Sequence, residues 1–83
     1  MTLTAILTNS NYMTGDGWKY WDGDSWENVS GVSGLTANGL QLTVDASPNN
    51  SAAYFNADTA RFKYVAHATA DATDVYEDIF TVF

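Results

Sequence analysis

The chain has 83 residues, a length that fits one domain with a small core, predicted to span residues 1–83. It contains no cysteine, so neither disulfides nor thiolate metal sites can stabilise it. Ten acidic against three basic residues give a net charge of −7, which argues against binding to nucleic acid or to anionic membranes. Stability must therefore come from burial of the three Trp, five Tyr and four Phe, or from assembly with other chains.

The amino-terminal segment predicts a strand over Thr2–Thr8, because apolar and polar side chains alternate there. One face carries Leu3, Ala5 and Leu7, and the other carries Thr2, Thr4, Ile6 and Thr8. No positive charge precedes this short apolar run, so we expect no signal peptide and a soluble protein. Without a secretory signal, the two Asn-x-Ser sequons, at Asn28 and Asn49, are interpreted as turn residues.

The stretch GDGWKYWDGDSWENVSG, residues 15–31, predicts a hairpin, because aromatic runs flank the turn dipeptide Asp22-Gly23. A two-residue loop would place Trp26 opposite Lys19. A three-residue loop would place Trp26 opposite Tyr20 and Glu27 opposite Lys19. We favour the second register, since it forms both an aromatic pair and an ion pair across the strands.

The middle of the chain indicates a second hairpin and two loops. Residues 29–34 are predicted to form a flexible connection, and Asn38-Gly39 is another hairpin dipeptide. A strand with one apolar face follows, formed by Leu40, Leu42 and Val44. Residues 47–51 are predicted to form a loop around the single proline, and Ala52–Phe55 a short strand.

The carboxy-terminal third is compatible with a helix or a strand over residues 58–70. Alternation of Phe62, Tyr64 and Ala66 with charged or β-branched neighbours favours a strand. We then expect a turn at Asp71–Asp74 and a closing strand at Val75–Phe83. About seven short strands result, which predicts an all-β fold: a small antiparallel sandwich or barrel, Ig-like or jelly-roll-like.

Two segments resemble known families. The run YVAHATAD at residues 64–71, with EDIFTV at residues 77–82, resembles the last two strands of Ig-like modules. WKYWDGDSW, residues 18–26, is similar to the W-D-G-x-x-W turns of tail-fibre, neck and capsid-decorating proteins of tailed bacteriophages. Those proteins are likewise small, acidic and free of cysteine. The resemblance implies a structural role at the virion surface, and it supplies no active site that maps onto this chain.

Candidate chemistry in the sequence is sparse. The sole histidine, His67, lies on a predicted strand with no serine, cysteine or second histidine placed to act with it. Asp22, Asp24 and Glu27, with Asp16 nearby, offer oxygen ligands that suit calcium, but the EF-hand spacing is absent. We therefore expect no enzyme, no catalytic residue, no metal and no cofactor.

Two binding hypotheses remain for the aromatic hairpin. Exposed tryptophans beside Asp and Asn could stack on sugar rings, a hypothesis that fails if all three tryptophans are buried. Alternatively, the surplus of large side chains on both strand faces indicates burial against other subunits. We favour a non-enzymatic capsid-decoration (cement) or tail-associated protein that contacts its own copies, a major capsid protein or a tail protein, with a glycan as the alternative ligand. The expected contact residues are Trp18, Tyr20, Trp21, Trp26, Asp22, Asp24 and Phe83.

Overall fold

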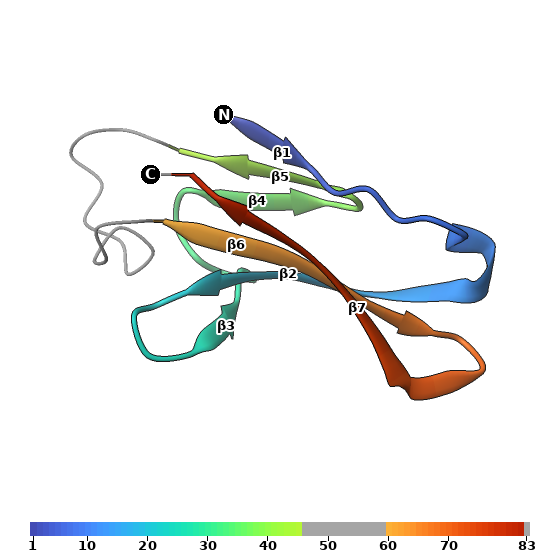
Figure 1. The fold of residues 1–83 in the computed structure, drawn as a ribbon. Coiled ribbons are helices and arrows are strands. Elements are labelled where there is room, and N and C mark those ends of the chain that lie inside the picture. The colour runs from blue at the N-terminus through green and yellow to red at the C-terminus, as the bar shows by residue number, and fades with distance from the viewer. Residues whose placement is uncertain (46–59, 83) are drawn as a thin grey trace.

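The computed structural model describes residues 1–45 and 60–82, and this part of the chain forms two antiparallel sheets stacked on each other (Figure 1). One sheet has the strand order β1-β5-β4 and the other the order β3-β2-β6-β7. The bounds are β1 Thr2–Thr4, β2 Met13–Trp21, β3 Trp26–Asn28, β4 Leu35–Asn38, β5 Gln41–Val44, β6 Arg61–Ala68 and β7 Asp71–Thr81, with a 3-10 turn η1 at Ser10–Tyr12. The all-β sandwich is confirmed, and the two sheets do not close into a barrel.

The three-stranded sheet has a clean division between an apolar and a polar face. β1 pairs with β5 only from Thr2 to Thr4, so it is shorter than the predicted Thr2–Thr8 strand, because β5 begins at Gln41. The predicted alternation is nevertheless confirmed beyond the ladder, since Ala5 is buried and Ile6 is exposed. Threonines line the water-facing side, where Thr2, Thr43 and Thr36 stand opposite one another.

The β4–β5 hairpin forms at the predicted Asn38-Gly39 dipeptide. Asn38 pairs with Gln41, which leaves Gly39 and Leu40 as a two-residue turn. Gly39 has a φ of 57°, and a glycine at the first central position is what a type II′ hairpin turn requires. This turn brings Leu42 and Val44 inward, where both are fully buried.

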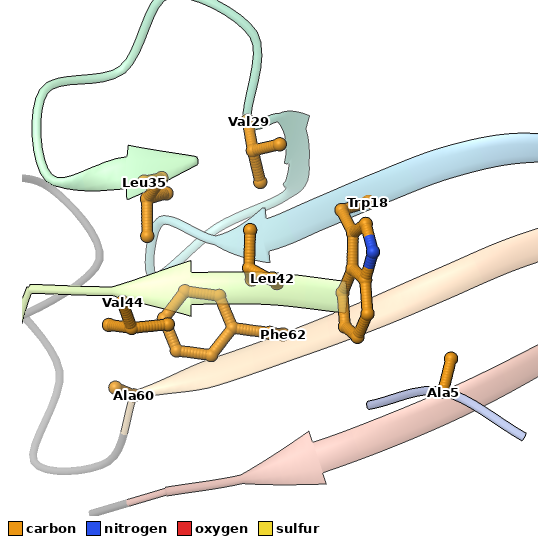
Figure 2. Close-up of a cluster of buried hydrophobic side chains, with 8 residues drawn as sticks. All are labelled: Ala5, Trp18, Val29, Leu35, Leu42, Val44, Ala60 and Phe62. Carbon is orange, nitrogen blue, oxygen red and sulfur yellow. The ribbon is translucent and has the colours of Figure 1, made fainter. Parts of the chain in front are cut away.

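The core lies between the sheets and is built around Trp18 and Phe62 (Figure 2). Trp18, at 3% exposure, packs edge-on against Tyr64 with ring centroids 5.6 Å apart, and tilted against Phe80 at 5.7 Å. Its Nε1–H donates a hydrogen bond to the carbonyl of Gly39, 3.1 Å away in the other sheet. The remaining buried residues of this cluster are Ala5, Val29, Leu35, Leu42, Val44 and Ala60.

Residues 61–68 are a strand, which confirms the choice of strand over helix for the described part of the 58–70 segment. β6 is the central strand of its sheet over this stretch, paired with β2 on one side and β7 on the other. Phe62 and Ala66 have no exposed surface, as expected for positions that face the opposing sheet. The period of two therefore reflects a strand whose inner face contributes to the core.

The turn between β6 and β7 differs from the prediction. It lies at Thr69-Ala70, because Ala68 pairs with Asp71, and Asp71 already begins β7. The register then shifts, so that His67 pairs with Val75 and the intervening residues bulge out of the ladder. Asp71 stabilises this irregularity by accepting hydrogen bonds from the backbone N–H and the hydroxyl of Thr73. The predicted strand at Ala52–Phe55 and the loop at residues 47–51 lie outside the described residues.

The β2–β3 hairpin is also formed, but both registers considered from the sequence are wrong. Trp21 pairs with Trp26, Tyr20 with Glu27 and Lys19 with Asn28, so the loop contains the four residues 22–25. The Asp22 carboxylate accepts the backbone N–H groups of Asp24 and Ser25, both at 2.8 Å, which organises this longer loop. The aromatic pair is therefore Trp21–Trp26, and Lys19 binds the Asn28 side chain instead of Glu27.

Gly15 provides a test of packing on the inner face of β2. It lies opposite Ala66, and a Cβ atom at this position would come 2.1 Å from the Oη of Tyr64. We expect Gly15→Ala to lower the free energy of unfolding by about 1–3 kcal/mol, the usual cost of overpacking a core. Tyr64→Phe removes the clashing hydroxyl, so the double variant should recover part of that loss. Chemical denaturation of the four proteins measures the coupling, and strictly additive effects would contradict the proposed clash.

Candidate interaction surface

The water-facing side of the four-stranded sheet is rich in aromatic, apolar and basic side chains. Alternation along β2 turns Trp18 inward and Trp21 outward, and the directly paired Trp26 shares the side of Trp21. We call this side the outer face; it is formed by Trp21, Trp26, Lys19, Arg61, Lys63, Val65, Val75, Glu77 and Ile79. The corresponding side of the three-stranded sheet carries threonines, so the two exposed faces of the sandwich differ in chemistry.

Lys63 lies at the centre of the outer face and is only 9% exposed. Its ammonium group forms an ion pair with Glu77 of β7 and stands over the ring of Trp26, 4.5 Å from the ring centroid. A carboxylate on one side and an aromatic ring on the other restrain this long side chain. The outer face is therefore ordered before any partner binds, which reduces the conformational entropy lost on binding.

All three basic residues of the chain lie on the outer face. Lys19 of β2 stands directly opposite Lys63 of β6, and Arg61 is two positions along the same strand. Lys19 donates a hydrogen bond to the side-chain oxygen of Asn28 at 2.8 Å. In a chain with net charge −7, this clustering separates a basic aromatic surface from the acidic remainder.

The tryptophan pair lies at one end of the outer face, next to the hairpin loop. Trp21 and Trp26 are both half-buried, and their rings meet edge to face with centroids 5.4 Å apart and planes inclined by 63°. The loop beyond them is held by Asp22, whose pKa lies below its usual value because the backbone N–H groups of Ser25 and Asp24 donate to the carboxylate. The pair thus sits on an ordered hairpin end.

His67 and Asp16 form a pair that the sequence analysis missed. The register of β2 against β6 shifts between Gly15 and Gly17, and the extra residue, Asp16, points its carboxylate at His67. The Nδ1 atom of His67 lies 2.8 Å from Oδ2 of Asp16. The sequence Gly15-Asp16-Gly17 could have indicated this bulge, because a glycine with a positive φ often marks one, and the φ of Gly17 is 106°.

The expected contact residues separate into three groups. Trp18 and Tyr20 both point to the inner face. Trp18 is buried in the core, so a structural role replaces its expected contact with a partner, whereas Tyr20 is half-buried against the core and its contact stays a prediction. Trp21 and Trp26 remain on the outer face, and Asp22 and Asp24 lie in the adjacent loop. Phe83 is outside the described residues. At least one exposed tryptophan surface therefore persists, as both binding hypotheses require.

A cleft of about 610 Å³ opens on the other side of the same sheet, beyond the end of the three-stranded sheet. It forms because β6 and β7 are longer than β1, β4 and β5, so the β6–β7 hairpin projects past the sandwich (Figure 1). Three tyrosines and two aspartates line it together with Ile6: Tyr12, Tyr64, Tyr76, Asp74 and Asp78. The backbone N–H of Ile6 donates to Asp78 at 2.9 Å, which ties the amino-terminal segment to β7.

Comparison with known proteins gives no match among protein-family models, curated proteins or solved structures. Within residues 1–45 and 60–82, no three His, Cys, Asp or Glu side chains are grouped so that they could hold a metal ion. No helix in that part of the chain is long and apolar enough to cross a membrane. The function must therefore be inferred from the surfaces of the molecule.

The Asp22 loop predicts an acid-sensitive contribution to stability. Because the folded-state pKa of Asp22 is lowered from 3.8, its contribution is present above that value and is lost as the pH falls through the folded pKa. We expect the stability gap between wild type and Asp22→Ala to shrink between about pH 5 and about pH 2. Asp22→Asn, whose side-chain oxygen can still accept the two N–H bonds, should show less acid sensitivity than wild type. Denaturation at several pH values measures this, and parallel curves for all three proteins would contradict the role of the carboxylate.

Proposed function

We propose that this chain is a non-enzymatic structural protein that acts through protein–protein contacts made by the outer face of its four-stranded sheet. The observation that supports the proposal most is the difference between the two water-facing sides of the sandwich. One presents a row of threonines, whereas the other presents two tryptophans, three basic side chains and exposed Val75 and Ile79. A two-layer sandwich needs only its inner faces to be apolar, so the apolar outer face calls for a separate explanation.

The chemistry of the outer face supports a contact with protein. Tryptophan, tyrosine and arginine dominate the binding energy of protein interfaces, and central residues that are already ordered lose less entropy on binding. Trp21 and Trp26 supply the aromatic anchors, and Ile79, which is 55% exposed, lies on the same face at the other edge of the sheet, on β7. Lys63 is held between Glu77 and Trp26 and need not be ordered by the partner.

In this proposal the chain is a capsid-decoration or tail-associated subunit at the virion surface of a tailed bacteriophage. Support comes from the resemblance of WKYWDGDSW to the turns of such proteins and from the acidic, cysteine-free composition. Copies on a virion meet in a symmetric arrangement, which multiplies weak contacts into a stable layer. The expected partners are other copies of this chain and a capsid or tail protein.

Sugar binding is the alternative function, and the geometry of the tryptophans weighs against it. A sugar ring stacks on a free aromatic face, but the ammonium group of Lys63 stands over the Trp26 ring. Trp21 meets Trp26 edge to face, so the two rings do not form one flat platform. The alternative would depend mainly on the remaining exposed surface of Trp21.

Solution mass tests the proposal directly. We expect light scattering after size exclusion to show association of the wild-type chain that increases with concentration. Ile79→Glu should weaken this association about tenfold or more, because burying an isoleucine contributes roughly 1.5–3 kcal/mol and about 1.4 kcal/mol is a factor of ten. Thr43→Glu adds the same charge to the water-facing side of the other sheet and should leave the association unchanged.

Three results would count against assembly through the outer face. Equal loss of association in Ile79→Glu and Thr43→Glu would indicate a general charge effect. A wild-type chain that stays monomeric would remove self-assembly from the proposal. Tryptophan fluorescence that iodide quenches readily and that added oligosaccharide protects would favour the sugar-binding alternative.

A further inference from the structure

β7 has one edge without a backbone partner among the described residues. It follows β6 at the end of the order β3-β2-β6-β7, and it extends over 11 residues from Asp71 to Thr81. Natural edge strands are commonly protected by charged side chains, lysine above all, by proline, by bulges or by short length. β7 has a bulge before Val75 and four acidic side chains, but no lysine, arginine or proline, and its pairing with β6 is regular from Val75 to Thr81. The regular stretch is therefore suited to accept a strand that brings positive charge.

The two sides of β7 differ along that regular stretch. Val75 and Ile79 point to the outer face and are 54% and 55% exposed. Tyr76 and Asp78 alternate with them and line the cleft on the other side, where Asp74 accepts a hydrogen bond from the Tyr76 hydroxyl at 3.1 Å. A strand added beside β7 would place successive side chains alternately against an apolar surface and against this acidic, tyrosine-lined cleft.

The charges around β7 specify the chemistry of its partner. β7 carries four acidic residues and no basic one: Asp71, Asp74, Glu77 and Asp78. Glu77 is paired with Lys63, and no basic side chain lines the cleft where Asp74 and Asp78 lie. A carboxylate has room for about four hydrogen bonds, so the bonds from Tyr76 and Ile6 leave acceptor capacity. Tyrosine faces also attract ammonium and guanidinium groups.

A second copy of this chain does not fit that requirement. Its basic residues, Lys19, Arg61 and Lys63, all lie on β2 and β6, inside the four-stranded sheet. The strands at the described edges, β1, β3, β4 and β7, carry no lysine or arginine. Antiparallel pairing of two β7 strands would bring acidic residues together, which is destabilising.

We propose that β7 binds an extended segment of another protein as an added strand, with lysine or arginine side chains facing Asp74, Tyr76 and Asp78 and apolar side chains covering Val75 and Ile79. Main-chain hydrogen bonds to β7 supply the attraction, and the alternation of basic and apolar side chains supplies specificity. The inference rests on the proposed function, because it names the partner segment of a protein that works through protein contacts. It uses the edge of the sheet, whereas the assembly contact uses the outer face, and Val75 and Ile79 belong to both.

Synthetic peptides of about nine residues test this inference. We expect a peptide of alternating lysine and valine to bind the full chain and to slow hydrogen exchange at backbone amides of β7, because strand addition buries them. The same peptide with glutamate in place of lysine should show no binding, because like charges then meet. Two further peptides carry N-methyl groups on all lysine amides or on all valine amides. Alternate amides of an extended strand point to opposite sides, so one methylated peptide should bind and the other should lose about tenfold or more in affinity.

Protein variants test the charge requirement. Asp74→Asn/Asp78→Asn keeps side-chain oxygens for the bonds from Tyr76 and Ile6 while it removes two charges. We expect it to bind the lysine peptide roughly five- to tenfold more weakly, since each exposed ion pair contributes modestly. The matched control, Asp24→Asn/Glu27→Gln, removes two charges from the β2–β3 hairpin, whose strand β3 lies at the opposite edge of the sheet, and should bind like wild type.

The outcomes separate this inference from the proposed function. Equal affinity of both methylated peptides, or equal loss in both, would overturn backbone pairing with β7. Equal weakening in the two charge variants would overturn recognition by Asp74 and Asp78 and indicate attraction to the net charge alone. Self-association and its sensitivity to Ile79→Glu are measured without any peptide, so a failure of strand addition would leave assembly through the outer face in place, and the reverse holds as well.

Discussion

The indole of Trp18 connects the two sheets, and much of the remaining structure depends on its position. It packs against Tyr64 and Phe80 of its own sheet and donates its N–H to the Gly39 carbonyl of the other. This hydrogen bond satisfies the polar atom that a buried tryptophan brings into a core. Because Trp18 points inward, alternation along β2 directs Lys19 and Trp21 outward. The outer face is thus a geometric consequence of the core.

Unequal strand lengths create the second surface of interest. Strands of three and four residues form one sheet, whereas β6 and β7 contain eight and eleven residues. The four-stranded sheet extends beyond the three-stranded sheet that packs on it, and the molecule is correspondingly elongated, with dimensions of 43 × 23 × 21 Å. Tyr12, Tyr76 and Asp78 consequently line an open cleft where a matched second sheet would have buried the same side of β7. Exposed apolar residues collect at this end, including Ile6, which is 81% exposed.

The charged side chains are distributed unevenly between the two sides of the four-stranded sheet. The three basic residues gather on the outer face, and Lys63 is fixed there by Glu77 and Trp26. The acidic residues of β7 that face the cleft have no basic neighbour in its lining. One sheet thus presents two chemically different surfaces, the outer face and the acidic cleft, which meet at β7, where Val75 and Ile79 belong to the outer face and Tyr76 and Asp78 line the cleft.

The strand character of the chain was predictable from residues close in sequence. Alternation at residues 2–8 and 61–68, and the Asn38-Gly39 and Asp22-Gly23 dipeptides, located β1, β6 and two hairpins, because period and turn chemistry are local properties. Register was not predictable. The Asp22 carboxylate lengthened one loop and Asp71 produced a bulge in place of a turn, because each carboxylate accepts hydrogen bonds from backbone N–H groups two or three positions further along the chain. The site depended on tertiary structure most of all. The Lys63–Trp26 contact, the His67–Asp16 pair and the cleft each join strands remote in sequence, and the free edge of β7 exists because the sheet ends there. Local pattern thus determined which residues form strands and which side chains of a strand share a face. Only the pairing of distant strands decided which side chains meet on the surface, since those contacts depend on sheet order and register.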